Sequence, residues 1–387
     1  MKPRGSEAEE VGPEADRDWV QGLRRDLVAW YRQGHRDLPW RADHDPYRVL
    51  VAETMLVQTT VAAVVPYYHR FLGRFPTLEA LASAAEADVV KAWEGLGYYR
   101  RARRLHQAAQ AIRANHAGRV PDDLGALQAL PGVGRYIAGA VMSFAFDKAA
   151  PIVEANTRRV LARLIAWPED LGSSKSQARL WTLAEALVPE EGAGTFNQAI
   201  MELGATVCSP KGPMCLICPV SAHCRVRKRG LQDEVPVLAD RPKPTVVEEE
   251  CAVVEKEGRW LMVQRGPNGL WAGFWEFPTL HRNGPNPADR PLGADVSLQE
   301  GVRLLTGVRC RVLDEITTAS YSVTKYRVTL TVCRAVGLDE TTMSCLGSVA
   351  AWFGPDELAG LTLGSATRKL IARLGAPKGG EEASWRP

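Results

Sequence analysis

The chain has 387 residues, of which 45% are hydrophobic and 24% are charged, and its formal net charge is +3. This composition is typical of a globular protein, and the length favours two domains. A membrane-spanning protein is excluded at this stage, because no apolar run approaches the roughly 20 residues that a span needs. The weakly basic balance does not by itself indicate nucleic acid, so the local clusters of charge carry more information.

The chain opens with a polar, acidic stretch and then becomes helical. Residues 1–17 predict a disordered tail without the apolar core of a signal peptide. From residue 18 to about 200, apolar residues recur at three- and four-residue steps, which is the pattern of amphipathic helices. Asp18, Pro46 and Thr77 each open such a segment. We therefore predict an all-α domain over residues 18–224. Because the first residues lack the pattern of a signal peptide, we expect the protein to stay in a reducing compartment.

A carboxylate interrupts the apolar stretch VAETMLVQTT, in which Glu53 is the only charged residue. A glutamate in such surroundings has two interpretations. It forms a buried ion pair, for which Arg36 and Arg41 are the nearest upstream candidates, or it acts as an acid whose pKa burial has raised. The residues alone favour the ion pair.

A glycine-rich turn joins two helix patterns within LQALPGVGRYIAGAVMSFAF. Alternate glycines, Gly132 and Gly134, let backbone N–H groups converge on an anion at a helix N-terminus. Arginines gather at 100–104, at 158–159 and in RVRKRG at 225–230. Taken singly, a tight helix–helix turn and solvated helix faces are the commoner explanations. Together they favour a surface that binds DNA phosphates.

Four of the eight cysteines crowd into CSPKGPMCLICPVSAHC. Their C-x6-C-x2-C-x5-C spacing suits one metal centre, with Cys208, Cys215, Cys218 and Cys224 as ligands. Structural zinc sites use two closely spaced pairs and only one is present, so an iron–sulfur cluster is favoured over zinc. The remaining cysteines are expected to be small buried hydrophobes: Cys251, Cys310, Cys333 and Cys345.

After the cysteines the pattern changes. Residues 225–247 are basic and then proline-rich, and they predict a linker. Residues 248–374 alternate as strands do, with helix patterns near 297–305 and 364–374. Residues 375–387 predict a second disordered tail. The expected fold class is multidomain, an all-α domain followed by a smaller α+β domain.

These motifs together resemble the MutY-type adenine DNA glycosylases, which belong to the helix-hairpin-helix superfamily with endonuclease III. The resemblance spans about residues 20–374 and is carried by LPGVGRYIAGA, GLGYYRRARRLHQAA, FNQAIMELGATVC and the cysteine spacing. It implies base-excision repair, in which adenine mispaired with 8-oxoguanine or guanine is removed from double-stranded DNA. It further implies a [4Fe-4S] cluster on the four cysteines and a C-terminal Nudix-like domain.

The resemblance also implies catalytic roles. Glu53 falls on the general acid of the family motif S-E-x-M-L-Q-Q-T. In PIVEANTRRV, Glu154 replaces the family aspartate that stabilises a sugar cation, and Asn156 is retained. Tyr136 occupies the position where lyase relatives carry a Schiff-base lysine, so a monofunctional glycosylase is expected.

DNA contacts follow from the same resemblance. Gln58 matches a residue that inserts into the duplex, Tyr98 one that wedges beside 8-oxoguanine, and Gln198 one that reads the adenine edge. Further contacts are expected from Arg41 and from the turn Pro131, Gly132, Val133, Gly134 and Arg135.

In the second domain, Thr324 keeps a hydroxyl where the family loop H-x-F-S-H has serine, whereas Tyr321 and Lys325 replace the two histidines. These three residues are the candidates for reading 8-oxoguanine. The region SLQEGVRLLTGV retains Glu300 but lacks the acidic set that binds magnesium in Nudix hydrolases, so diphosphate hydrolysis is not expected.

Two alternatives stay open at this stage. One is an endonuclease III-like glycosylase/lyase, and the other is a DNA-binding relative impaired by the change at Glu154. We expect a monomer that does not bind membranes and is cytoplasmic and nucleoid-associated. The short connector at 225–247 favours a bacterial source.

Overall fold

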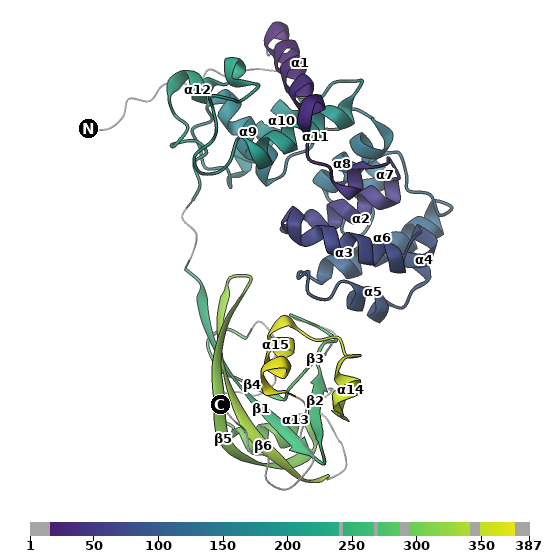
Figure 1. Cartoon of the computed structure of the whole chain (residues 1–387), viewed down its shortest axis with the longest axis vertical. Helices are drawn as coiled ribbons and strands as arrows, with labels where there is room; N and C mark the ends of the chain where they lie inside the picture. The colour runs from purple at the N-terminus through teal and green to yellow at the C-terminus, as the bar shows by residue number, and fades with distance from the viewer. Residues whose placement is uncertain (1–15, 240–242, 267–269, 287–294, 341–348, 376–387) are drawn as a thin grey trace, which may run out of the picture. The chain divides into compact units, whose positions relative to one another are not determined.

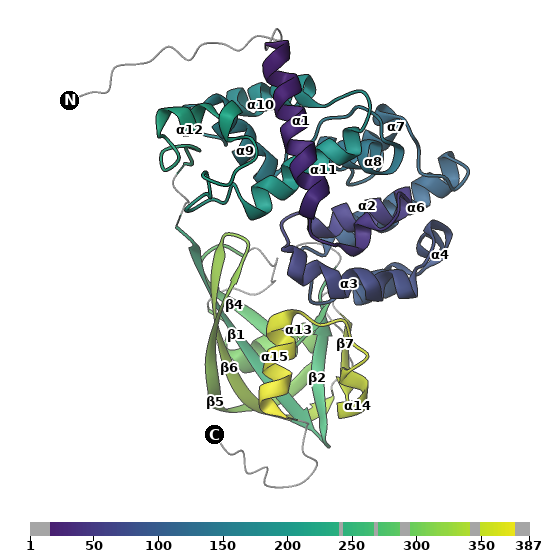
Figure 2. The ribbon, with the colours of Figure 1, turned by 45° about the horizontal axis from the view of Figure 1, so that its top comes forward.

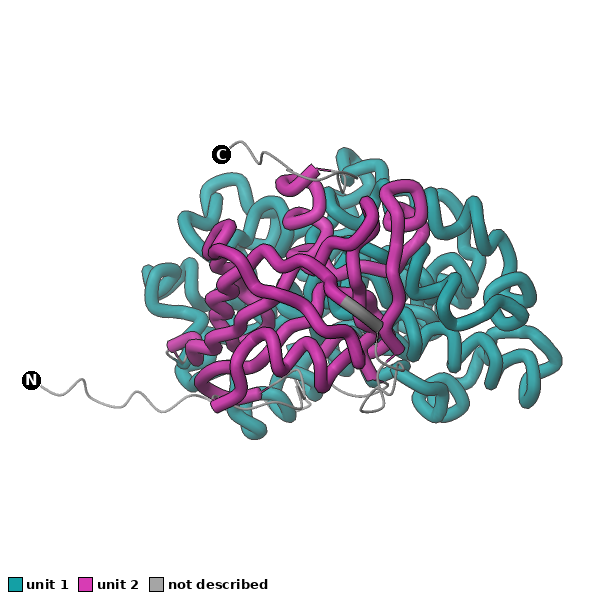
Figure 3. Tube along the Cα trace, turned by 90° about the horizontal axis from the view of Figure 1, so that it is seen from below, with its two compact units in different colours: residues 1–240 teal, residues 241–387 magenta. Residues whose placement is uncertain are grey.

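The computed structural model describes residues 16–239, 243–266, 270–286, 295–340 and 349–375. The chain divides into two compact units, residues 1–240 and 241–387 (Figures 1 and 3). The predicted tails lie outside the described residues except for Asp16, Arg17 and Gly375. Asp16 caps the first helix, Arg17 begins it, and Gly375 follows the last helix. No helix in the described part of the chain is long and apolar enough to cross a bilayer.

The first unit is all-α, as predicted. Its α-helices are α1 (Arg17–Gly34), α2 (Pro46–Leu56), α3 (Val61–Arg74), α4 (Leu78–Ser83), α5 (Glu86–Ala92), α6 (Arg100–Asn115), α7 (Leu124–Gln128), α8 (Arg135–Phe146), α9 (Ala155–Ile165), α10 (Ser174–Leu187), α11 (Ala193–Thr206) and α12 (Arg225–Arg229). Two short 3-10 helices are η1 (Pro39–Arg41) and η2 (Ser221–His223).

Side-chain caps fix several helix starts, because an acceptor oxygen satisfies backbone N–H groups that the helix leaves open. The predicted starts at Pro46 and Thr77 are confirmed: Asp45 caps α2, and Thr77 caps α4. The start at Asp18 is wrong by one residue. Asp16 accepts from the backbone N–H of Asp18, and the helix begins at Arg17.

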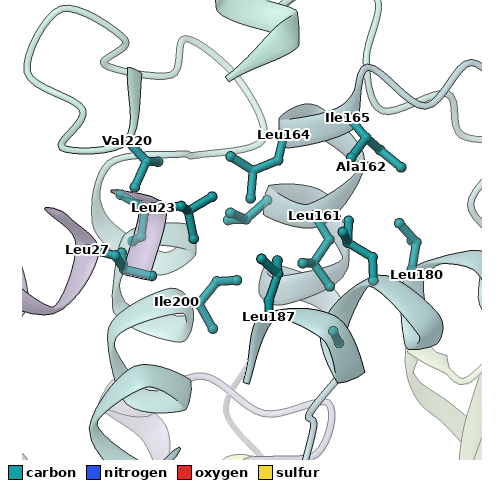
Figure 4. Close-up of a cluster of buried hydrophobic side chains, with 14 of the residues drawn as sticks. Leu23, Leu27, Leu161, Ala162, Leu164, Ile165, Leu180, Leu187, Ile200 and Val220 are labelled. Carbon is teal, nitrogen blue, oxygen red and sulfur yellow. The ribbon is translucent and has the colours of Figure 1, made fainter. Parts of the chain in front are cut away.

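Two groups of helices meet at the centre of this unit. Helices α1, α9, α10 and α11 share a core in which Leu27, Leu161, Leu187 and Ile200 are buried (Figure 4). Helix α2 packs on α8, and α11 contacts both α8 and α9. Helix α2 is apolar on nearly all sides and is buried from Val49 to Met55, as expected of a helix at the centre of a domain.

The predicted linker is shorter than expected at its N-terminal end. Residues 225–229 form α12, and the Arg163 guanidinium on α9 donates to the carbonyl of Val235 at 2.8 Å. Val226 and Val235 are buried in the first core. This part of the predicted linker therefore belongs to the first unit, because its apolar residues complete the core beside α9.

The second unit is an α+β fold around one sheet. In the described residues the strand order is β3-β2-β1-β6-β5, with β4 paired to β1 and β7 to β2. The strands are β1 (Thr245–Lys256), β2 (Arg259–Gln264), β3 (Trp275–Glu276), β4 (Thr279–Asn283), β5 (Val308–Val323), β6 (Tyr326–Glu340) and β7 (Val349–Phe353). The helices are α13 (Leu298–Thr306), α14 (Pro355–Leu358) and α15 (Ser365–Leu374). Strands β1 and β6 are parallel.

Both faces of the sheet are covered. Alternate residues of β1 point to opposite faces, so Ala252 and Val254 join a core with α13, whereas Cys251 and Val253 join another with α15 (Figure 2). The predicted helices near 297–305 and 364–374 are confirmed. The predicted burial of Cys251, Cys310 and Cys333 is also confirmed, and Cys345 lies outside the described residues.

Candidate active site

Glu53 lies on α2 with 2% of its surface exposed. Burial raises the pKa of its carboxyl to about 7, and the nearby Glu154 charge raises this pKa further. The Tyr136 hydroxyl opposes the shift by donating to Glu53 Oε2 at 2.5 Å. Near neutral pH this carboxyl therefore holds a proton about half of the time, which suits a general acid.

The ion-pair interpretation of Glu53 is wrong. Arg36 and Arg41 both bind Glu202 on α11 instead, with Arg36 Nε 2.7 Å from Oε1 and Arg41 Nη2 3.0 Å from Oε2. Two guanidiniums stabilise the charge of Glu202 and lower its pKa, although burial acts in the opposite direction and is the largest influence. Arg41 keeps only 11% of its side chain exposed, so its bond to Glu202 limits the predicted role in binding DNA.

Tyr136 is the second residue of α8 and follows the predicted glycine-rich turn. Gly132 has φ +79°, and a Cβ atom there would lie 2.5 Å from the Arg104 Cβ, so this position requires glycine. The Val133 side chain is buried, and its N–H donates to the Leu130 carbonyl. The open N–H groups are those that begin α8, which are not used within the helix.

The other residues of the turn have distinct surroundings. Pro131 is half-buried and Gly134 is exposed at the N-cap of α8. The Arg135 guanidinium lies 3.9 Å from the centroid of the Trp181 ring and bonds Glu185. The positive charge of Arg135 is therefore partly neutralised by Glu185, a neighbouring residue of the same unit.

Glu154 is the N-cap of α9. Its Oε1 accepts from the backbone N–H groups of Asn156 and Thr157, both at 2.8 Å, and Thr157 completes a capping box. Burial raises the pKa of this carboxyl, and the two backbone bonds hold the shift back. Since both capping bonds use Oε1, the second oxygen of Glu154 stays outside them.

Three helices thus bring three ionisable groups together. The charge of Glu154 raises the pKa of Glu53 and of Tyr136, which shows that all three groups interact. Asn156 lies beside them at the start of α9, where its Oδ1 accepts from Arg159 at 2.9 Å. The cluster combines a protonated carboxyl, a hydrogen-bonding phenol and a second carboxylate.

Two of the arginines expected at the DNA surface lie inside the protein. Arg159 is buried and donates to the carbonyls of Gly204 and Cys208. Arg101 is half-buried and donates to backbone carbonyls at the end of α2. The periodicity of the sequence does not distinguish these two arginines from Arg100, which is exposed. It does not show which arginines of a helix point toward open backbone carbonyls of neighbouring turns.

The predicted duplex-contacting residues occupy unusual backbone conformations. Gln58 (φ +60°) and Tyr98 (φ +50°) are both left-handed, which is uncommon for residues other than glycine. Both side chains are exposed, Tyr98 by 48%. Gln198, the predicted adenine reader, accepts from the Tyr31 hydroxyl at 2.6 Å through Oε1.

The four clustered cysteines line one cavity at the end of the first unit, beside α9 and α12. The buried Arg163 guanidinium donates to the Cys208 sulfur at 3.3 Å. In the described residues, no group of three or more histidine, cysteine, aspartate or glutamate side chains is arranged to hold a single metal ion. The four thiols thus line one cavity that has a positive charge beside it.

In the second unit, the predicted reading residues lie at a hairpin. Val323 pairs with Tyr326, so Thr324 and Lys325 form a two-residue turn. Thr324 has φ +50° and is exposed, as is Lys325. Tyr321 is half-buried, and its hydroxyl lies 3.4 Å from a carboxylate oxygen of Glu249. Thr324 and Lys325 are thus accessible to DNA, and Tyr321 less so.

The helix with the altered Nudix motif is α13. Its Glu300 is exposed and bonds Arg303 on the same helix.

Comparison with known proteins relates both units to families. Residues 51–186 match the HhH-GPD superfamily of base excision DNA repair proteins, and residues 250–373 match the NUDIX domain. The adenine DNA glycosylase of Mus musculus is 34% identical, over 95% of this chain and 82% of that protein. The chain belongs to the adenine DNA glycosylase family. The predicted fold class and the assignment as a DNA N-glycosylase of base-excision repair are therefore confirmed.

Other known proteins match only part of this chain. The adenine DNA glycosylase of Rattus norvegicus is 40% identical over 67% of this chain, and the match spans 61% of that protein. The structure of a thermostable thymine-DNA glycosylase is 31% identical, with a TM-score of 0.50, and covers 56% of this chain and 100% of its own. DNA is accordingly the partner of this chain.

The raised pKa of Glu53 predicts a pH-dependent stability. Because the folded state holds this proton more tightly than the unfolded state, its contribution is fully present below the ordinary pKa of 4.5 and is lost as pH rises through about 7. Glu53→Gln removes this dependence. The free energy of unfolding of the variant relative to wild type should therefore rise by about 3 kcal/mol between pH 4.5 and 8.

Chemical denaturation at several pH values measures this difference. Glu79→Gln, an exposed glutamate on α4, is the matched control and should show no such change. A constant difference between Glu53→Gln and wild type across this range would show that Glu53 has an ordinary pKa.

Proposed function

We propose that the chain is a monofunctional glycosylase that removes adenine mispaired with 8-oxoguanine or guanine from double-stranded DNA. The observation that carries the proposal is the buried, protonatable Glu53 beside Tyr136 and Glu154. Adenine is a poor leaving group until its N7 is protonated, and a carboxyl with a pKa of about 7 can supply that proton at neutral pH.

The steps follow from these groups. Glu53 donates its proton to adenine N7, the bond between the sugar C1′ and adenine N9 breaks with its electrons going to the base, and a sugar cation remains. Glu154 offers the negative charge that stabilises this cation, as carboxylates do in glycoside hydrolysis. Water then adds to C1′ and gives its proton to the Glu53 carboxylate, which restores the acid.

The longer side chain of Glu154, relative to the family aspartate, has a structural explanation. Two backbone N–H groups at the start of α9 donate to Oε1 of Glu154. These bonds fix the position of the carboxylate despite the extra methylene group of the side chain. Tyr136 supplies no amine, and strand cleavage through an imine has no nucleophile at this position.

Reaching adenine requires that the base leave the stack. Gln58 and Tyr98 are exposed and held in strained turns, as suits side chains that fill the space of a displaced base. Gln198, oriented by Tyr31, offers an amide to the adenine edge. The open N–H groups at the start of α8 suit a DNA phosphate.

We also assign a [4Fe-4S] cluster to Cys208, Cys215, Cys218 and Cys224. The support is that the four thiols line one cavity and that the buried Arg163 lies beside them. When bound, such a cluster would tie the loop after α11 to α9 and α12 and hold this end of the unit rigid. We further propose that the protein is a monomer and that it is cytoplasmic and nucleoid-associated. The short connector favours a bacterial source.

Replacement of Glu53 by glutamine tests the proposed chemistry. The variant keeps the shape but loses the proton, so adenine excision should fall by at least ~100-fold while duplex binding is retained. The assay uses a duplex with adenine opposite 8-oxoguanine, read with and without hot alkali. Wild-type cleavage only after alkali supports a monofunctional glycosylase.

Three other results of this assay would each contradict a different part of the proposal. Cleavage without alkali would indicate a lyase. Binding without cleavage would indicate a DNA-binding relative. Full activity of the Glu53→Gln protein, with Glu79→Gln as the control, would remove Glu53 from the mechanism.

Elemental analysis tests the cluster. The purified protein should contain about four irons per chain and should be brown, because a [4Fe-4S] cluster holds four iron atoms and absorbs broadly. Cys215→Ser should lower the iron content and the thermal stability, whereas Cys310→Ser, in β5, should leave the iron unchanged. One zinc per chain with no iron would contradict the assignment.

Substitutions at Thr324 test the reading of 8-oxoguanine. Thr324→Ala should lower the preference for adenine opposite 8-oxoguanine over adenine opposite guanine by a few-fold to about tenfold, the value of one hydrogen bond. Thr324→Ser keeps the hydroxyl and should keep the preference. Equal preference in all three proteins would place lesion reading elsewhere.

A further inference from the structure

The turn after α2 and the turn before α6 carry the two exposed side chains assigned to the duplex, Gln58 and Tyr98. Both residues have a positive φ, a conformation that is unfavourable for residues other than glycine. Strain of this kind persists only where surrounding contacts impose it. Contacts around each turn therefore have to hold this conformation.

Arg101, on the first turn of α6, makes those contacts. Its Nη1 donates to the carbonyls of Thr54 at 3.1 Å and Met55 at 2.8 Å, and also to the carbonyl of Val57. These are carbonyls at the C-terminal end of α2, which the helix itself leaves without partners. The residue after Val57 is Gln58.

The same guanidinium also bonds neighbours of the two exposed side chains. Arg101 Nη2 donates to Thr59 Oγ1 at 3.0 Å and to the carbonyl of Gly97 at 3.2 Å. Gln58 therefore lies between two residues bound by Arg101, and Tyr98 directly follows a third. In addition, the guanidinium lies 5.4 Å from the centroid of the Tyr98 ring, a cation–π contact.

The chemistry of arginine suits this position. Its planar fork offers several donors in fixed directions, so one side chain can bond carbonyls from two turns at once. Burial lowers the pKa of Arg101 to about 10, which still leaves the group charged at neutral pH. Lysine has a single flexible ammonium and cannot reproduce the arrangement.

We propose that Arg101 is a positioning residue that fixes Gln58 and Tyr98 together as one rigid wedge for opening the duplex. This inference rests on the proposed function, in which these two side chains enter the DNA. A wedge fixed before binding loses little conformational freedom when it enters the stack, so more of the stacking free energy is available to displace adenine.

The matched variants are Arg101→Gln and Arg113→Gln. Arg113 lies on the same helix, outside the arginine cluster at 100–104, and donates to Glu79 and Ser83 on α4. Unstacking is followed by the fluorescence of 2-aminopurine placed at the target adenine in the full-length protein. Excision is followed under single-turnover conditions as a function of pH.

Arg101→Gln should weaken the unstacking by about 5- to 100-fold, the range of one aromatic–base stacking contact. It should leave the pH profile of the remaining excision unchanged, because Glu53 keeps its surroundings. Arg113→Gln should behave as wild type. When Arg101→Gln is combined with Tyr98→Ala, the loss should be smaller than the product of the two separate losses, because both act on one wedge.

Two results would overturn the inference. One is normal unstacking by Arg101→Gln together with a shifted pH profile, which would mean that Arg101 acts on Glu53 through α2. The other is a loss of unstacking in the double variant that equals the product of the losses in the two single variants. If Arg101→Gln does not fold, Arg101→Lys is measured in the same way, and wild-type unstacking by that protein contradicts the proposal. A wild-type protein that excises no adenine would instead contradict the proposed function.

Discussion

The removal of the Glu53 carboxyl from water is the constraint on which the site depends. An apolar helix at the centre of the first unit carries this group. Arg36 and Arg41 bond Glu202 rather than Glu53, and the charge of Arg41 lowers the pKa of Glu53 less than burial raises it. An unpaired buried carboxyl stays protonated to a higher pH. Burial of this carboxyl destabilises the fold at neutral pH, and it leaves an acid where the proposed chemistry needs one.

The same few contacts connect fold, site and DNA. Helix α2 holds Glu53 and ends at the carbonyls that Arg101 binds, so the acid and the proposed wedge share one element. The turn before α8 positions Tyr136 and opens N–H groups, and the start of α9 holds Glu154 by its cap. Each charged group in this region has either a specific partner or a chemical role, which explains why buried polar residues are tolerated here.

Much of this architecture is predictable from sequence, and the exceptions have physical causes. The all-α unit, the glycine turn, the cysteine cluster and the α+β unit follow from periodicity and spacing. The interpretation of Glu53 as an ion pair fails because proximity in sequence does not specify which helix an arginine faces, and Glu202 lies far along the chain. Arg101 looked like one of several surface arginines, since its partners are backbone carbonyls that no side-chain pattern reveals.

The proposed chemistry depends most on the protonation state of Glu53, and infrared difference spectroscopy of wild type minus Glu53→Gln observes it directly. We expect a carbonyl stretch of a protonated, buried carboxyl that is present at pH 6 and disappears with a midpoint of about 7. A band that is already absent at pH 6 would show that Glu53 is ionised under neutral conditions, and it would contradict the role of this residue as the acid.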